Sequence, residues 1–270
     1  MYHRVCADSE PAASRYVVTR GTFHQQMRFL AQHGFWTPRL VDLLDGSWTN
    51  NHEGKRPIMI TFDDGYLDVY ENAFPVMQEF GFSAIIFVVP DFTRRTNWWD
   101  PPGRLRNVDL LQPHHIQRMC RLGVEFGAHS FSHRSLPALS NCELEGELQK
   151  GKCCSEGFLH QCFLAVAYPY GDVDERVKEA AKRAGYQCGF AAHSGPLRFS
   201  SDLFEIRRTI LENRANNVYL WYKVSGLANV LHWITWSAKK LVGVKKTYHL
   251  SSPDREIRVR DIGQSRMHES

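Results

Sequence analysis

Two adjacent carboxylates, Asp63 and Asp64, stand between an apolar run and Gly65 in the stretch TFDDGY. Neighbouring like charges repel each other unless a cation lies between or beside them. A divalent metal removes this difficulty, because one carboxylate can bind the ion while the other stays free as a base. A turn at the glycine can swing both side chains toward one cavity. The other interpretation of Asp-Asp-Gly is a structural turn and cap.

Two histidines four residues apart, His129 and His133, form a second polar cluster in the stretch GAHSFSHRSL. On a helical turn this spacing places both imidazoles on one face, within reach of a single ion. One aspartate and two histidines would supply three protein ligands and leave a position open for water, as in catalytic zinc sites. A lone histidine is more often structural, but the pair follows a predicted strand, as Asp63 and Asp64 do.

The elements that must position these clusters are predicted by short apolar runs that alternate with helical patterns. The expected strands lie at 58–62, 84–89, 124–127, 162–167, 187–191 and 204–211, and the expected helices at 22–33, 70–80, 113–122, 142–157 and 173–184. Thr22 is the expected N-cap of the first helix. Short strands separated by single helices indicate an α/β barrel or a doubly wound parallel sheet. In both folds the chemistry lies at the carboxyl ends of the strands.

A third strand end has the sequence AYPYG, in which Pro169 and Gly171 turn the backbone. Such a turn can aim an N–H group at developing negative charge. The stretch 91–113 is predicted to be a long rim loop. Its Trp98 and Trp99 could stack on the apolar faces of sugar rings, and burial against the barrel is the alternative.

In order and spacing, these motifs resemble those of the polysaccharide deacetylases, the NodB-homology or carbohydrate esterase family 4 enzymes. The resemblance extends over roughly residues 1–225 and rests on MYHRV, TFDDGY, HSFSH, AYPYG and EIRRTIL. It implies a deformed (β/α)7-type barrel that removes N-acetyl groups from N-acetylglucosamine-containing polymers, oligomers or glycan precursors.

The resemblance also implies roles for individual residues. Asp63 would be the general base, and Zn²⁺ or another divalent metal would be held by Asp64, His129 and His133. The tetrahedral oxyanion would rest on the metal and on the backbone N–H of Tyr170. Beside these roles, the turn residues Pro169 and Gly171 and the rim residue Trp99 are expected to contact the substrate.

One departure from the family pattern lies in the third motif. Many members have an arginine there that pairs with the catalytic aspartate, whereas this chain has Ala167. Arg208 or Arg207, at the end of another predicted strand, is expected to take that place. Salt bridging at the edge of the barrel is the other interpretation of these two arginines.

A second departure concerns the general acid, because the usual C-terminal Leu-x-His motif is absent. The branch of poly-N-acetylglucosamine deacetylases has a Tyr-His near the N-terminus instead, and this chain begins with Tyr2 and His3 after Met1. The first and last strands of a closed sheet are neighbours, so a histidine on either can reach the same leaving amine. His3 is the expected acid, and His193 is the reserve candidate.

Two other functions stay open at this point. A catalytically silent carbohydrate-binding relative would explain both departures from the family pattern. An O-acetyl esterase or a glycolipid deacylase would keep the metal and change the bond that is broken.

The composition is that of an ordinary globular chain of 270 residues, of which 43% are hydrophobic and 23% charged. Nine basic and four acidic residues lie in 223–270, so the rest is nearly neutral and has no footprint for nucleic acid. Seven cysteines without a CxxC pair indicate reduced thiols. The N-terminus lacks a secretory signal pattern, which predicts a cytoplasmic or membrane-peripheral protein unless the sequence is truncated.

We expect a catalytic domain over 1–225, followed by an amphipathic helix and a polar tail over 226–270. Residues 224–238 contain no Asp, Glu, Lys or Arg, but fifteen residues are too few to span a bilayer. The segment 221–240 is either an interfacial membrane helix or a helix packed over the barrel. The interfacial interpretation rests on Trp221, Trp233, Trp236, Lys239 and Lys240.

Overall fold

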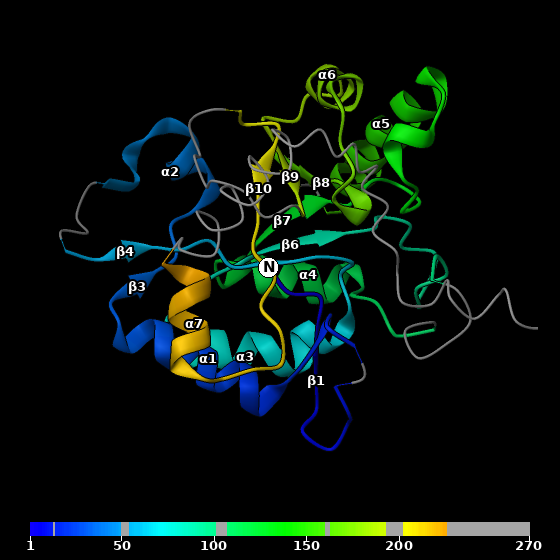
Figure 1. Cartoon of the computed structure of the whole chain (residues 1–270). Helices are drawn as coiled ribbons and strands as arrows, with labels where there is room; N and C mark the ends of the chain where they lie inside the picture. Colours follow the sequence, from blue (N-terminus) through cyan, green and yellow to red (C-terminus); the bar gives the residue numbers. More distant parts are fainter. Residues whose placement is uncertain (13, 50–53, 101–106, 160–162, 193–201, 226–270) are drawn as a thin grey trace, which may run out of the picture. The chain divides into compact units, whose positions relative to one another are not determined.

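The computed structural model describes residues 1–12, 14–49, 54–100, 107–159, 163–192 and 202–225 (Figure 1). The predictions for 226–270, which include Trp233 and Trp236, lie outside the described residues, as does His193. Within the described ranges, every helix is too short or too polar to cross a bilayer.

Six parallel strands form one curved sheet in the order β10-β9-β8-β7-β6-β5 (Figure 1). Their bounds are β5 Thr61–Phe62, β6 Ile85–Val88, β7 Glu125–Ala128, β8 Ala165–Ala167, β9 Cys188–Ala191 and β10 Ile206–Arg207. Each strand pairs with the next one along the chain, which is the arrangement that single helical crossovers produce. The alternation of strands and helices in the sequence therefore predicted the sheet correctly.

The first two residues close this sheet into a deformed barrel. Tyr2 pairs with β5, where the Tyr2 N–H donates to the Thr61 carbonyl over 2.8 Å and the Asp63 N–H donates to the Tyr2 carbonyl over 3.0 Å. On the other side, the Met1 nitrogen donates to the Thr209 carbonyl over 2.9 Å. The segment that follows β10 is thereby joined to β5 through Met1 and Tyr2. The prediction of a deformed (β/α) barrel is confirmed.

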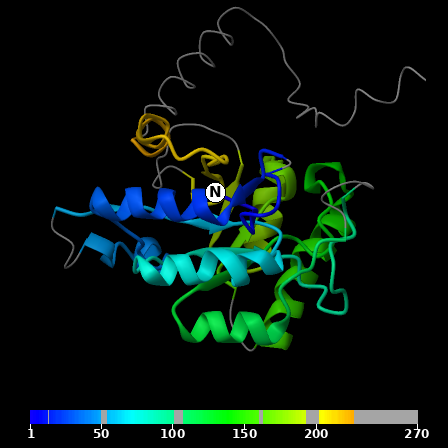
Figure 2. The ribbon, with the colours of Figure 1, turned by 90° about the horizontal axis from the view of Figure 1, so that it is seen from below.

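Most of the helices cover the outer face of the sheet, whereas α2 (Leu40–Asp45) packs through Leu40 on the apolar cluster of the inner face. Figure 2 shows α1 and α3 side by side, with His24 Nε2 3.0 Å from Glu79 Oε1. The helices are α1 Arg20–Gln32, α2 Leu40–Asp45, α3 Phe74–Glu79, α4 Pro113–Arg121, α5 Asn141–Leu159, α6 Glu175–Arg183 and α7 Asn217–Val224. Alternate strand residues form a second apolar cluster on the inner face, where the Phe87 and Phe190 ring centroids are 5.1 Å apart.

Short elements that the periodicity did not predict complete the fold. In the part of the chain that the structure describes, two pairs of parallel strands lie beside the main sheet, and three single turns of 3₁₀-helix connect elements. The strand pairs are β1 Arg4–Cys6 with β2 Val17–Thr19 and β3 Phe35–Trp36 with β4 Arg56–Pro57, and the 3₁₀ turns are η1 Ser47–Thr49, η3 Leu136–Ala138 and η4 Pro169–Gly171. Elements of two or three residues are too short to show a period in the sequence.

Two helix predictions are corrected by the structure. Helix α1 begins at Arg20, and its N-cap is Thr19, whose hydroxyl accepts from the Thr22 N–H. The expected helix 70–80 is a π-helical turn, η2 Val69–Ala73, followed by α3. Pro75 has no N–H to donate within a regular helix, and a wide turn directly before it relieves this mismatch.

The first and last expected strands are shorter than predicted. In 58–62, only β5 belongs to the main sheet, because the Ile58 N–H donates to the Trp36 carbonyl beside β3. In 204–211, only β10 pairs with β9, and the Leu211 N–H donates to the Met1 carbonyl instead. A hydrophobic run in the sequence predicts that a segment is buried. Tertiary contacts decide which strand that segment pairs with, and therefore where the strand ends.

Candidate active site

Asp64, His129 and His133 meet at the carboxyl ends of β5 and β7. Oδ1 of Asp64 lies 3.4 Å from Nε2 of His129 and 3.0 Å from Nε2 of His133. All three side chains are buried, and one ligand atom from each lies within 4.8 Å of the others. The structure thus brings together the three residues that the sequence predicted as metal ligands.

The two imidazoles converge through a bend and not through a helical turn, which corrects the prediction from their spacing. Ser130 and His133 have positive φ angles of 56° and 59°, and Asp64 has a φ of 72°. Left-handed backbone is unfavourable for residues other than glycine and occurs mainly where the surroundings impose it. The ring centroids of His129 and His133 lie 4.9 Å apart as a result.

A hydrogen bond to the backbone orients the His129 ring of the triad. His129 Nδ1 lies 2.8 Å from the Ala167 carbonyl, which can only accept, so Nδ1 carries a hydrogen and Nε2 is the ring nitrogen that faces Asp64. Asp64 Oδ1 is buried and accepts no hydrogen bond from the described residues. A carboxylate oxygen and two imidazole nitrogens that converge in a buried site fit a cation, and this set of ligand atoms suits a divalent transition metal.

Asp64 is held in its charged form. Burial opposes ionisation of this carboxyl group, but the imidazoles of His129 and His133 outweigh it and hold the pKa of Asp64 well below its usual value. Burial likewise opposes charge on His129, and Asp64 and Asp63 together still raise the pKa of that imidazole. The site therefore stabilises positive charge beside Asp64.

Asp63 makes a separate, bidentate ion pair with Arg208. The two guanidinium nitrogens NH1 and NH2 donate to Oδ1 over 2.6 Å and to Oδ2 over 2.8 Å. Arg208 also donates to the Thr61 hydroxyl and, through Nε, to the Ala191 carbonyl. Burial would raise the pKa of Asp63, but Arg208 and then His129 lower it below its usual value. Asp63 is therefore an ionised carboxylate beside the triad.

Of the two candidate arginines, Arg208 pairs with Asp63, while its neighbour Arg207 has a different partner. The Arg208 guanidinium lies between the rings of Phe87 and Phe190, with its carbon 5.4 and 5.7 Å from their centroids. Arg207 points the other way and donates to Glu205 over 2.8 Å. Successive strand residues face opposite sides of a sheet, so only one of the two arginines can reach Asp63.

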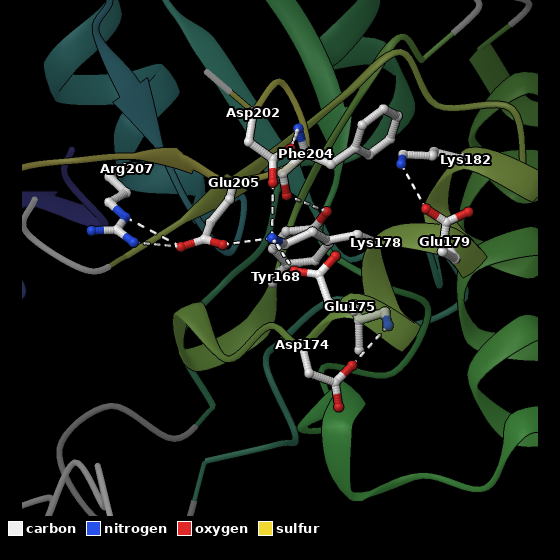
Figure 3. Close-up of polar contacts among 11 residues, drawn as sticks. Tyr168, Asp174, Glu175, Lys178, Glu179, Lys182, Asp202, Phe204, Glu205 and Arg207 are labelled. Atoms are coloured by element: carbon white, nitrogen blue, oxygen red, sulfur yellow. Dashed lines mark hydrogen bonds and ion pairs between the residues drawn. The ribbon is translucent and has the colours of Figure 1, made fainter. Parts of the chain in front are cut away.

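A buried lysine fixes the segment that leads into β10 (Figure 3). Lys178 of α6 lies 2.8 Å from Glu175 and from Asp202, and 2.7 Å from Glu205. These contacts raise the pKa of Lys178 despite its burial. Next to this lysine, the Tyr168 hydroxyl donates to the Phe204 carbonyl over 2.9 Å. The cluster ties the chain just before Arg208 to α6 and to the end of β8.

The third motif forms a sharp turn beside the triad. Tyr170 has a φ of 61° and its ring centroid lies 4.9 Å from that of His133. Gly171 has a φ of 75°, and a Cβ there would lie only 2.4 Å from the Cβ of Ala192, so a side chain does not fit. Pro169 is buried at the start of the turn.

An open cleft of about 380 Å³ lies beside His133. Trp99 stacks on His133, with ring centroids 4.9 Å apart and an interplanar angle of 19°. The buried indole nitrogen of Trp99 has no hydrogen-bond partner among the described residues. The cleft is lined by Trp98, Trp99, Ser132, His133, Arg134, Ser135, Ala138, Leu139 and Tyr170.

His3 lies near the two aspartates, next to Tyr2 at the seam of the barrel. Its ring packs on Tyr16 with centroids 4.6 Å apart, and its buried Nδ1 has no partner among the described residues. Burial lowers the pKa of His3, while the charges of Asp64 and Asp63 oppose that shift.

Three residues near the site were not predicted. The Tyr66 hydroxyl donates to Asp100 over 3.3 Å, and Asp64 contributes to raising the pKa of both groups, after burial. Glu147 binds the turn that contains His133. Tyr66 ends the TFDDGY motif and could have been included on that ground, whereas Asp100 and Glu147 have no signal in the local pattern.

Comparison with known protein families shows which family contains this chain. The family profile described as polysaccharide deacetylase matches residues 50–189, which is more than half of the chain and includes both aspartates, both histidines and the third motif. The chain belongs to the polysaccharide deacetylase family. The family and enzyme class predicted from the sequence are thereby confirmed.

Individual relatives of this polysaccharide deacetylase are distant. A Bacillus subtilis protein named as a polysaccharide deacetylase, YxkH, is 24% identical over 211 residues, which cover 77% of this chain and 68% of that protein. The poly-beta-1,6-N-acetyl-D-glucosamine N-deacetylase of Staphylococcus aureus is 24% identical over 216 residues, which cover 77% of this chain and 72% of that protein. The Streptococcus pyogenes deacetylase PplD, solved in complex with acetate, has the same fold, with a TM-score of 0.69, 23% identity and coverage of 83% and 95% of the two chains.

Proposed function

We propose that this protein is a divalent-metal-dependent hydrolase that removes N-acetyl groups from N-acetylglucosamine-containing poly- or oligosaccharides or glycan precursors. The observation that carries the proposal is the separation of the two aspartates: Asp64 faces two imidazoles, and Asp63 is paired with Arg208. Asp64 is thus available to bind a cation, and Asp63 is available to accept a proton. The similarity to the Staphylococcus aureus N-deacetylase supports N-acetylglucosamine as the sugar.

The chain's own residues can perform each proton transfer of an amide hydrolysis. Water attacks the acetamide carbon, and Asp63, kept ionised by Arg208, takes its proton as general base. The carbon–nitrogen bond then breaks, His3 gives a proton to the leaving amine, and acetate is released. The backbone N–H of Tyr170 is assigned to the oxyanion. Zn²⁺ or a similar ion, held by Asp64, His129 and His133, would supply Lewis acidity at the carbonyl and lower the pKa of the water.

The cleft beside the triad supports a sugar-binding role. Trp98 and Trp99 present aromatic surface of the kind that stacks on pyranose rings. Pro169 and Gly171 shape the turn on the other side, where absence of a side chain at Gly171 lets the backbone approach Ala192.

The test combines metal content with acetate release. Wild-type protein should retain about one divalent ion and release acetate from N-acetylglucosamine oligomers. Asp63→Asn should keep the ion and lose about 10²–10⁴-fold in kcat. Asp64→Asn should lose the ion as well. Full activity of Asp63→Asn would remove this residue from the mechanism, and release of acetate only from O-acetylated sugars would favour the esterase alternative.

A further inference from the structure

The carboxylate of Glu147, on α5, is bound entirely by the turn between the two histidine ligands. Oε2 accepts from the Phe131 N–H over 3.0 Å and from the Ser132 N–H over 2.8 Å, and Oε1 accepts from the Ser132 hydroxyl over 2.5 Å. The residue is 9% exposed. Among the described residues no Lys, Arg or His forms an ion pair with it, so hydrogen bonds from the turn satisfy its charge.

This turn has a backbone conformation that it would not adopt by itself. Ser130 and His133 are left-handed, and the Ser130 hydroxyl accepts from the His133 N–H over 3.0 Å. Glu147 therefore binds Phe131 and Ser132, which lie between the two left-handed residues. Strained conformations persist only where surrounding contacts determine them.

A second contact of α5 with the turn lies one helical turn beyond Glu147. A Cβ atom at Gly151 would lie 3.2 Å from the carbonyl carbon and oxygen of Ser130, which is closer than nearly all such contacts. Glu147 and Gly151 are four residues apart and so share one face of the helix. The same face of α5 thus contacts the beginning and the middle of the turn.

We propose that Glu147 is a positioning residue for the metal ligand His133 and that it sets the affinity of the site for its cation without touching the ion. By holding residues 131 and 132, it determines where the turn delivers His133 relative to His129 and Asp64. The proposal rests on the metal dependence of the proposed function. Groups that orient metal ligands commonly change metal affinity by about 10–100-fold when they are replaced.

The test compares zinc affinity of Glu147→Gln with that of wild type, by competition with a chromophoric chelator at one pH. The glutamine keeps the size, but it replaces the charged acceptor by a neutral amide oxygen and places an NH₂ group where Oε1 accepts from the Ser132 hydroxyl. We expect zinc affinity to fall at least about 10-fold. The matched control is Glu145→Gln on the same helix, whose carboxylate is paired only with Arg183 at the surface, and it should bind zinc as wild type does.

Thermal unfolding of the metal-free proteins separates positioning from general stability. If Glu147 only supported α5, Glu147→Gln would lower the metal-free melting temperature and leave the zinc affinity of the folded protein unchanged, which would overturn the proposal. Should Glu147→Gln fail to fold, Ser132→Ala removes just the hydroxyl donor and should still weaken zinc binding, by a smaller factor. Unchanged zinc affinity in Ser132→Ala would then overturn the proposal.

The outcome for Glu147 can be told apart from the outcome for the proposed function. Weaker zinc binding by Glu147→Gln, together with wild-type protein that releases no acetate from any N-acetylated glycan, would support the positioning role and refute the deacetylase reaction. Wild-type protein that binds no zinc or other divalent ion would refute both.

Discussion

At the scale of single residues, Asp63 and Asp64 show how two identical neighbours acquire different chemistry. The left-handed backbone at Asp64 turns its carboxylate toward the histidines, while Asp63 remains opposite Arg208. Both carboxylates are ionised despite their burial. Arg208 lowers the pKa of Asp63, and the imidazoles of His129 and His133 lower the pKa of Asp64. The bidentate geometry also fixes the direction of the free lone pairs of Asp63, which a single point charge would not do.

This geometry predicts that Arg208→Lys will not restore the function that Arg208→Ala loses. A lysine can keep the charge but not the two parallel hydrogen bonds to Asp63, so we expect kcat to fall about 10-fold or more in both variants. Arg207→Ala is the matched control, since that side chain pairs with Glu205, and its kcat should stay within about twofold of wild type. Steady-state acetate release measures all three, and a fully active Arg208→Lys would contradict the expectation.

At the scale of elements, β10 is a strand of two residues that must still place Arg208 accurately. It pairs with β9, and the chain before it is tied down by Lys178 and its three carboxylates (Figure 3). Carboxylates this close would repel each other without the lysine. The cluster therefore supplies the rigidity that so short a strand lacks.

The cluster predicts a pH-dependent contribution to stability from Glu205. Burial opposes its ionisation, but Lys178 and Arg207 outweigh this and lower its pKa. A pKa that is lower in the folded state gives stability that is present above the unfolded pKa, about 4.3, and is lost as pH falls through the folded value. Glu205→Gln should thus cost about 2 kcal/mol at pH 7 and much less in strong acid.

Urea unfolding of wild type and Glu205→Gln at several pH values measures this difference. Glu179→Gln is the control on α6, because its pair with Lys182 is exposed and should contribute little to stability at any pH. A stability loss in Glu205→Gln that is equally large at pH 7 and in strong acid would show that charge is not its cause.

At the scale of the whole molecule, closure of the barrel depends on a buried glutamine of α1. The Gln26 side chain accepts from the Tyr2 hydroxyl over 2.8 Å and donates to the carbonyls of Glu212 and Arg214 over 2.9 and 2.7 Å. It is fully buried. One side chain thus joins the first strand segment to the chain that follows β10, and the same seam places His3 beside the aspartates.

We expect Gln26→Leu to destabilise the fold by about 3 kcal/mol, because it leaves a buried hydroxyl and two carbonyls without their partner. Gln25→Leu is the control, since Gln25 is exposed on the same helix and its replacement should change stability by less than about 0.5 kcal/mol. Chemical denaturation gives both values. Equal stability of Gln26→Leu and wild type would mean that the seam does not depend on this network.

Much of the fold and of the site could be predicted from local pattern alone. The helices α4 and α6 lie within two residues of their predicted bounds, and the four residues Asp63, Asp64, His129 and His133 follow predicted strands. Hydrophobic period and strand-end position are encoded by neighbouring residues, so a sequence shows them directly. The motif order added the family, which no single motif would have given.

The sequence by itself determined the alternation of strands and helices, the candidate ligands and the pair of aspartates. Only the tertiary structure decided which arginine meets Asp63, how a bend instead of a helix joins the two histidines, and that Glu147 binds this bend. These contacts join residues up to 145 positions apart, as Asp63 and Arg208 are. Their geometry follows from closure of the barrel and from packing of helices on it, and local spacing has no information on either.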